Sequence, residues 1–339
     1  MTRICFTGGL RPTFVINDYE ILKSCFDVDV VEKPVKKLLS SEWLRYAFIL
    51  AEKVKQSDLT FSWFAGWHSA FAVFFSKLFG KKSIVVAGGF DCASVPEIDY
   101  GAFSKKRFWK EGLAAKYVFE NADRVLAVSE FTGNEILKRV KPGWLEVIYN
   151  GVDVEKFSSD TVRRENLVVT VSEIKWPNLK RKGIETFVKS AQLVPEASFV
   201  VIGKFKDDSI GYLRSIAPSN VEFTGFVSDE TLVRWYQRAK VICQLSYYEA
   251  FGLAPAEGMA CGCIPIVTGE RAGLPEVVGD TGFYVPYGDP KATAKAIIKA
   301  LNAPDESRED VRGRIVKIFS LDRRGEELIK LIRTLRESK

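Results

Sequence analysis

The chain has 339 residues, about twice the length of a typical domain, so we expect two domains. With 47% hydrophobic and 27% charged residues, it has the composition of a soluble globular protein, which excludes a largely disordered or fibrous chain. The net charge of +6 favours anionic ligands or a membrane surface, but the basic residues are too dispersed to indicate a nucleic-acid partner.

The amino terminus, MTRICFTGG, predicts a strand within the first few residues, and no apolar run reaches the roughly 18 residues of a membrane span. We therefore expect no signal peptide and no transmembrane helix. The predicted location is cytoplasmic, and peripheral attachment to the cytoplasmic membrane face is a further hypothesis.

The six cysteines are scattered, mostly within apolar runs, which predicts buried thiols in a reducing compartment instead of disulfides. Cys261 and Cys263 resemble half of a metal site. No second pair follows at ligand spacing, so we expect core thiols and no bound metal.

Short apolar runs alternate with helical patterns along the chain. The first set has the character of buried strands and comprises residues 3–10, 59–64, 82–89 and 124–129. After VIYNGVD, a second set comprises residues 167–173, 198–204, 221–226, 240–246 and 264–269. Continuously apolar strands separated by helices indicate parallel sheets covered on both faces. The predicted fold class is therefore α/β, with two Rossmann-like, doubly wound domains facing across a cleft.

The expected domain boundaries lie at 1–155 and 156–312, followed by a C-terminal helix at 313–339. The tail SLDRRGEELIKLIRTLRESK is amphipathic, with its apolar side formed by Leu328, Leu331, Ile332 and Leu335. This helix would close the second domain or cross back to the first.

Two glutamates frame an apolar, glycine-containing stretch in LSYYEAFGLAPAEGMACG, which indicates strand, loop, helix and glycine turn. Glu249 is expected in the loop after the strand, and Glu257 in the first turn of the helix. Three backbone N–H groups would point out of the helix N-terminus and could bind an anion, those of Phe251, Gly252 and Leu253. The carboxylates suit a ligand whose hydroxyl groups flank a diphosphate. The alternative is an acidic first turn stabilised by the helix dipole and a solvated loop glutamate.

This stretch, with GMACGCIPIVT, GLPEVV and GDTGFYVPYGDP after it, resembles the retaining glycosyltransferases of family 4, which have the GT-B fold. Further matching motifs follow the expected order along nearly the whole chain: FTGGL, ADRVLAVSEFTGNEI, VIYNGVDVEKF, RKGIETFVKSAQLV, FVVIGK and VEFTGFVSDETL. The resemblance implies an acceptor-binding domain at 1–155 and a nucleotide-sugar-binding domain at 156–312. It implies metal-independent transfer of a sugar from a nucleotide-diphosphate sugar to a glycan or lipid-linked acceptor, with no other cofactor.

The resemblance also implies roles for individual residues. Glu249 would contact the donor sugar, Lys182 would neutralise the diphosphate, and Glu257 would hold the ribose. The amides of Phe251, Gly252 and Leu253 would bind the donor's phosphates and sugar. Gly8 and Gly9 would form a loop that lets the backbone approach the substrates; their alternative role is a tight turn.

The sequence departs from the family pattern at two places. Ser172 and Glu173 stand where the family has Gly-Arg, so Lys175 or Arg181 would have to replace the arginine that binds the diphosphate. Many members have a histidine facing the donor sugar after the strand KSIVV, where this chain has Gly89, with Asp91 just beyond.

The only histidine of the chain, His68, follows the strand at 59–64. Asp91 and His68 are therefore candidate catalytic or acceptor-binding residues. Their alternatives are a turn cap for Asp91 and a packed, hydrogen-bonded residue for His68.

The segment 103–119 mixes basic and aromatic residues, among them Phe103, Lys105, Lys106, Arg107, Phe108, Trp109 and Lys110. It could lie on anionic lipid headgroups, or it could be a solvated helix face with buried aromatic residues. Two other classes of function compete with transfer. One is a GT-B-fold nucleotide-sugar-binding module with weak or no activity, which Glu173 favours. The other is a nucleotide-sugar epimerase, against which the single histidine argues.

Overall fold

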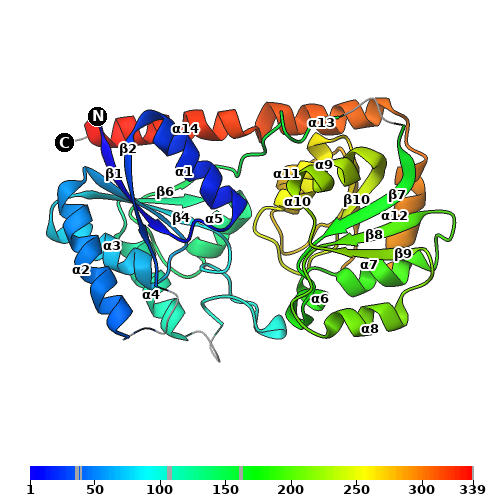
Figure 1. Cartoon of the computed structure of the whole chain (residues 1–339), viewed down its shortest axis with the longest axis horizontal. Helices are drawn as coiled ribbons and strands as arrows, with labels where there is room; N and C mark the ends of the chain where they lie inside the picture. The colour runs from blue at the N-terminus through cyan, green and yellow to red at the C-terminus, as the bar shows by residue number, and fades with distance from the viewer. Residues whose placement is uncertain (35–37, 39, 105–108, 160–162, 338–339) are drawn as a thin grey trace. The chain divides into compact units, whose positions relative to one another are not determined.

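The computed structural model describes residues 1–34, 38, 40–104, 109–159 and 163–337, and the chain divides into two compact units. The first unit comprises Met1–Asn150 and Asp322–Lys339, and the second Gly151–Leu321. Within the described residues, each unit contains a six-stranded parallel sheet with helices packed on it (Figure 1). The predicted α/β class with two doubly wound sheets is confirmed.

The first sheet has the strand order β2-β1-β3-β4-β5-β6. Its strands are β1 Arg3–Gly8, β2 Asp27–Glu32, β3 Leu59–Trp63, β4 Lys82–Ala87, β5 Arg124–Ala127 and β6 Leu145–Val147. The helices of this unit are α1 Thr13–Cys25, α2 Ser41–Gln56, α3 Trp67–Leu78, α4 Trp109–Asn121, α5 Glu130–Leu137 and α14 Leu321–Glu337, with a 3-10 turn η1 at Pro96–Ile98. The chain leaves β1 in one direction towards β2 and returns on the other side as β3. A topological switch point, where ligands of such sheets bind, therefore lies at the carboxyl ends of β1 and β3.

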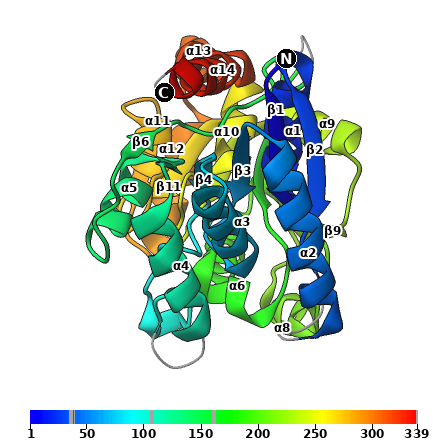
Figure 2. The same cartoon turned by 90° about the vertical axis from the view of Figure 1, so that its left-hand side faces the viewer.

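Helices α2, α3 and α4 lie side by side in the first unit (Figure 2). The central strand β3 is covered on both faces, since every one of its residues is buried. The largest fully buried side chains of this sheet are Phe6, Phe61 and Trp63.

The C-terminal helix α14 belongs to the first unit, and a buried ion pair holds it there. The Arg324 guanidinium donates to both carboxylate oxygens of Asp18 in α1, at 2.6 and 2.7 Å. The same guanidinium donates to the carbonyl oxygens of Ile148 and Tyr149, and Asp18 also accepts from the Trp63 indole at 2.9 Å. Both charged groups are thus paired and hydrogen-bonded, as burial requires.

The second sheet has the strand order β12-β11-β10-β7-β8-β9. Its strands are β7 Glu165–Val171, β8 Ser198–Ile202, β9 Val221–Gly225, β10 Ala239–Gln244, β11 Ile264–Thr268 and β12 Phe283–Val285. Its helices are α6 Trp176–Arg181, α7 Ile184–Ala191, α8 Ser209–Ile216, α9 Asp229–Arg238, α10 Leu253–Ala260, α11 Leu274–Val278, α12 Pro290–Leu301 and α13 Glu306–Ile318. In this order the switch point lies between β7 and β10, so their carboxyl ends mark the expected ligand site of the unit.

The carboxyl-terminal part of the chain contains two helices where one was expected. Residues 313–318 form the end of α13 in the second unit, and α14 begins at Leu321. On α14, Leu328, Ile332 and Leu335 are buried, in agreement with the predicted apolar side.

No helix among the described residues is both long and apolar enough to cross a membrane. All six cysteines have free thiols, and Cys261 and Cys263 are buried. Within the described ranges, no cluster of three or more histidine, cysteine, aspartate or glutamate residues is arranged to hold a metal ion.

Candidate functional site

Lys182 and Glu249 meet at the switch point of the second sheet. Lys182 follows α6, the helix after β7, and Glu249 lies in the loop after β10. Gly183 makes this approach possible, because its φ is +66° and a Cβ there would lie 2.0 Å from the Leu245 carbonyl oxygen. A hydrogen bond from the Tyr247 N–H to the Arg181 carbonyl, 2.9 Å long, ties the two loops together.

The Lys182 ammonium and the Glu249 carboxylate form a hydrogen-bonded ion pair. Their side chains are only 18% and 13% exposed. Burial lowers the pKa of Lys182, against the attraction of Glu249. Burial alone would raise the pKa of Glu249, but the charges of Lys182 and Arg181 bring it below its ordinary value. The site therefore contains a largely buried ion pair in which each charge neutralises the other.

The N-terminus of α10 begins directly after Glu249. Gly252 precedes the helix with a φ of +100°, and a Cβ there would lie 2.4 Å from the Leu274 side chain, so only glycine fits. Within the described residues, the backbone N–H groups of Gly252 and Leu253 donate to no backbone carbonyl. Phe251 is buried and packs its ring edge-on against Phe319. The helix thus presents amide donors beside Glu249, as an anion site requires.

Glu257 lies in the second turn of α10, not in the first turn as predicted, because the helix begins at Leu253. Its carboxyl group accepts a hydrogen bond of 3.4 Å from the Tyr236 hydroxyl. Burial raises the pKa of Glu257 to about 8, and the bond from Tyr236 offsets this only in part. Glu257 is therefore mostly protonated at neutral pH while the site is unliganded.

Replacing Glu257 with glutamine is expected to flatten the pH dependence of the unfolding free energy between about pH 4.5 and 8. The folded protein keeps this proton up to about pH 8, whereas the unfolded chain loses it near the ordinary value of 4.5. Wild-type stability should therefore fall as the pH rises through this window, by up to about 1.4 kcal/mol per pH unit. Denaturant melts at several pH values measure this. Glu270→Gln, which changes an exposed loop glutamate, is the control, and parallel curves for Glu257→Gln and wild type would contradict the expectation.

Glu173 follows β7, where the family pattern has an arginine. Lys175 and Lys206 pair with its two carboxylate oxygens at 3.1 and 3.2 Å. Burial alone would raise the pKa of Glu173, but these two lysines lower it overall. Arg181 donates to the Asn178 side chain at 3.0 Å. Glu173 is thus a neutralised anion, and Lys182 is the cation that contacts Glu249.

In the first unit, Gly8 and Gly9 lie at the switch point, where Gly8 ends β1 and Gly9 follows it. Gly8 has a φ of +153°, and its carbonyl accepts from the Lys33 N–H at 3.3 Å. The Gly9 carbonyl accepts from the Arg11 N–H at 2.8 Å. Lys33 and Arg11, which we did not predict, place two exposed basic side chains at this edge. The clue to Arg11 was a basic residue soon after the first predicted strand, whereas Lys33 follows β2, which was not predicted.

His68 is buried in the first turn of α3, and its Nε2 is 2.8 Å from the Trp63 carbonyl oxygen. Burial lowers the pKa of His68 to about 4, helped by the charge of Lys33 and opposed by the bond to Trp63. The imidazole is therefore neutral at physiological pH, with Nε2–H as the donor. This arrangement is that of a packed, hydrogen-bonded histidine.

Asp91 is buried in the loop after β4, where its carboxylate joins two loops. It accepts from the Ala65 N–H at 2.8 Å, the Gly89 N–H at 2.9 Å and the Gly88 N–H at 3.1 Å. Burial raises the pKa of Asp91 to about 6, although these backbone bonds lower it. Because three amides surround the carboxylate, its geometry is that of a loop anchor.

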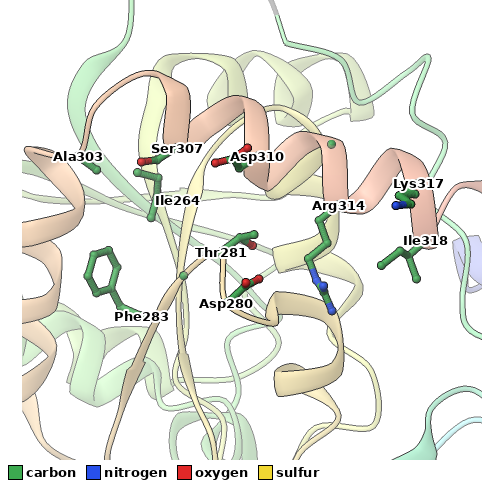
Figure 3. Close-up of a pocket in the computed structure, with 12 residues that line it drawn as sticks. Ile264, Asp280, Thr281, Phe283, Ala303, Ser307, Asp310, Arg314, Lys317 and Ile318 are labelled. Carbon is green, nitrogen blue, oxygen red and sulfur yellow. The ribbon is translucent and has the colours of Figure 1, made fainter.

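A cavity of about 690 Å³ in the second unit lies away from all these residues (Figure 3). It is at the amino ends of β11 and β12, beneath α13, and is lined by Ile264, Phe283 and Asp310 among others. Arg314 extends from α13 towards α11, where it donates to the carbonyl oxygens of Glu276 and Val277. This cavity is at the opposite edge of the sheet from Lys182 and Glu249 and contains none of the predicted site residues.

Comparison with known proteins gives matches along most of the chain. Residues 165–303 match the family model of glycosyl transferases group 1, and residues 24–156 match that of glycosyltransferase family 4. The O-antigen chain mannosyltransferase B of Escherichia coli is 27% identical over 57% of this chain and 54% of its own length. A GDP-mannose:cellobiosyl-diphosphopolyprenol alpha-mannosyltransferase of Xanthomonas campestris is 30% identical over 48% of this chain and 44% of its own. The chain thus spans about half the length of these curated relatives.

The fold of the chain is also that of solved structures. HepE of Anabaena, determined in complex with UDP and glucose, superposes with a TM-score of 0.80 at 16% identity, over 98% of this chain and 100% of that one. Because the two family models together cover most of both units, and the fold agrees, the chain belongs to the group 1 and family 4 glycosyltransferases with the GT-B fold.

Proposed function

We propose that the protein is a retaining glycosyltransferase that moves a sugar from a nucleotide-diphosphate sugar to a glycan or lipid-linked acceptor, without a metal ion or another cofactor. The observation that carries the proposal is the Lys182–Glu249 pair beside the N-terminus of α10. A lysine and backbone amides at a switch point suit a diphosphate, and an adjacent carboxylate suits sugar hydroxyl groups.

In this proposal, Lys182 leaves Glu249 when the donor binds and turns to the diphosphate. As the bond between sugar and phosphate breaks, negative charge develops on the leaving group. Lys182 and the amides of Gly252 and Leu253 stabilise that charge, an electrostatic effect of the oxyanion-hole kind. Glu249, freed from its partner, accepts hydrogen bonds from the donor sugar. The acceptor attacks the face from which the diphosphate leaves, and a phosphate oxygen takes its proton.

The known relatives support the substrate classes. The Xanthomonas campestris relative is named for GDP-mannose as donor and a diphosphopolyprenol-linked acceptor, and the Anabaena structure contains UDP and glucose. Both names fit a nucleotide-diphosphate donor. We therefore propose a nucleotide sugar as donor, and a glycan or a lipid-linked sugar as acceptor.

A thermal-shift panel of UDP, GDP, ADP and CMP with their sugars, each in EDTA and in magnesium, tests donor binding. We expect one diphosphate to raise the melting midpoint by a few degrees in EDTA, because ligand at about 100 times its dissociation constant adds about 2.7 kcal/mol. Lys182→Ala should abolish this shift. If no nucleotide shifts the wild type, the nucleotide-sugar proposal fails. Binding without any donor hydrolysis would favour the inactive binding module instead.

We also propose that the first unit attaches peripherally to an anionic membrane surface. Large apolar side chains are exposed on the three adjacent helices α2, α3 and α4, namely Leu44, Phe48, Phe74, Leu78, Trp109 and Leu113. Large apolar side chains exposed on adjacent helices suit contact with a membrane interface. Of the segment considered above, Lys105, Lys106, Arg107 and Phe108 lie outside the described residues, whereas Trp109 and Lys110 begin α4.

Replacing Phe48 and Phe74 together with serine is expected to weaken binding to vesicles of phosphatidylcholine and phosphatidylglycerol by about tenfold or more, through loss of buried apolar area. Sedimentation with vesicles measures this. Phe226→Ser removes a phenylalanine of the second unit that is exposed at least as much as Phe48 and Phe74, and it is the control. Equal vesicle binding by all three proteins would count against attachment through this face.

A further inference from the structure

A second cavity in the second unit, of about 500 Å³, is lined mainly by basic side chains. It lies at the amino edge of the sheet, where residues precede or begin β7, β10 and β11. The basic residues are Arg163, Arg164, Lys240, Arg308 and Arg312. The acidic residues are Asp305 and Glu309, which leaves a formal charge of +3. The side chain of Asp305 is fully exposed to water.

Part of this charge has a structural role at the end of α10. Arg312 donates to the Ala260 carbonyl, Arg164 to the Cys261 carbonyl, and Arg308 to the Gly262 carbonyl at 3.3 Å. Cations at the last carbonyls of a helix are favourable, because these groups have no partner within the helix. This role uses only some of the N–H groups that the guanidinium groups carry.

Further N–H groups of these arginines donate to the carbonyl oxygens of Tyr236, Ala239, Lys240 and Phe157, and the others remain available to a ligand. Arg308 is 7% exposed, and its Nε makes no hydrogen bond within the described ranges, although Asp305 approaches it to 3.4 Å. Arg163 is exposed and makes no hydrogen bond or ion pair within the described part of the chain. Burial and the nearby charge of Arg164 lower the pKa of Arg308. Arginine side chains of like charge that are held close together favour a bound anion.

We propose that this cavity binds a small anion with two or more phosphate groups, at a site distinct from the one formed by Lys182 and Glu249. The excess charge of +3 and the unused guanidinium donors suit a multiply charged, oxygen-rich ligand, which arginine binds through paired N–H groups. The two sites are at opposite edges of one sheet, since Lys182 and Glu249 lie beyond the carboxyl ends of β7 and β10. The inference does not depend on the proposed transfer activity.

Calorimetric titration of the full chain with pyrophosphate at low ionic strength tests the inference. The parent protein for this test carries Lys182→Ala, so that the donor site contributes little. We expect it to bind pyrophosphate at one remaining site, and addition of Arg163→Glu to weaken that binding by about tenfold or more. Addition of Glu309→Gln should strengthen it about threefold, a gain that misfolding cannot produce. Lys295→Glu, an exposed change of the same charge on α12, is the control.

Each result of the titration either supports or overturns the proposed second anion site. Loss of pyrophosphate binding through Lys182→Ala alone would show that the donor site is the only site, and would overturn the inference. So would equal affinities in the Arg163→Glu, Glu309→Gln and Lys295→Glu proteins. Melting midpoints confirm that each variant is folded. Failure of the proposed transfer function would appear instead in the wild type, as an absence of nucleotide binding.

Discussion

Replacing Lys182 with methionine is expected to lower the rate of sugar transfer by about 100-fold to 1000-fold. Methionine keeps the length of the side chain but removes the cation that would meet the leaving diphosphate. Removal of one preorganised donor from such a site costs about this much in other enzymes. Turnover at saturating donor measures the effect. Lys180→Met, which changes an exposed lysine two residues earlier, should leave turnover nearly unchanged.

The same substitution is expected to reduce stability, because it leaves the carboxylate of Glu249 without its partner. Loss of one member of a buried pair costs about 3 kcal/mol or more, and the partial exposure of this pair reduces the figure. The double variant Lys182→Met with Glu249→Gln should therefore recover most of the melting midpoint but none of the activity. Recovery of turnover in the double variant would contradict a direct role for Lys182 in transfer.

The sequence was sufficient to predict the fold because most strands are continuously apolar. The predicted runs at 59–64 and 167–173 became β3 and β7, which lie inside their sheets. The three strands that were not predicted, β2, β6 and β12, are all edge strands. β2, with the sequence DVDVVE, is half-exposed, and β6 and β12 have only three residues each. An edge strand is stabilised by one neighbour and needs little apolar surface, so its pattern resembles that of a loop.

The sequence could predict which residues of the candidate site lie at the ends of strands. It could not predict which of their side chains contact one another. The motif around Glu249 placed it at the end of β10, but no spacing could show that Lys182, 67 residues earlier, forms an ion pair with it. Asp91 was singled out by its place after a strand, yet three backbone amides surround it. Sequence position indicates which residues reach an edge of the sheet. Burial decides whether their side chains remain available for chemistry.

Gly183 allows the turn before α7 to approach Leu245 closely, because it has no side chain. Among the substitutions considered, its replacement by alanine is expected to lower the free energy of unfolding the most. An L-residue at its φ of +66° costs about 1–2 kcal/mol. In addition, the new Cβ would lie 2.0 Å from the Leu245 carbonyl oxygen and 2.7 Å from the Leu245 Cβ, so backbone has to move. We expect a total loss of about 3 kcal/mol or more in the unfolding free energy.

Urea denaturation followed by circular dichroism measures this loss, with Gly211→Ala as the matched control. Gly211 lies within α8 at an ordinary helical φ, and a Cβ there would meet no atom within 4 Å. Alanine at that position should be neutral or stabilise the protein by up to about 1 kcal/mol, since glycine disfavours helix. If Gly183→Ala were as stable as Gly211→Ala, close contact between the turn joining α6 to α7 and Leu245, just after β10, would not be needed. The close approach that brings Lys182 to Glu249 would then have to come from contacts other than this glycine.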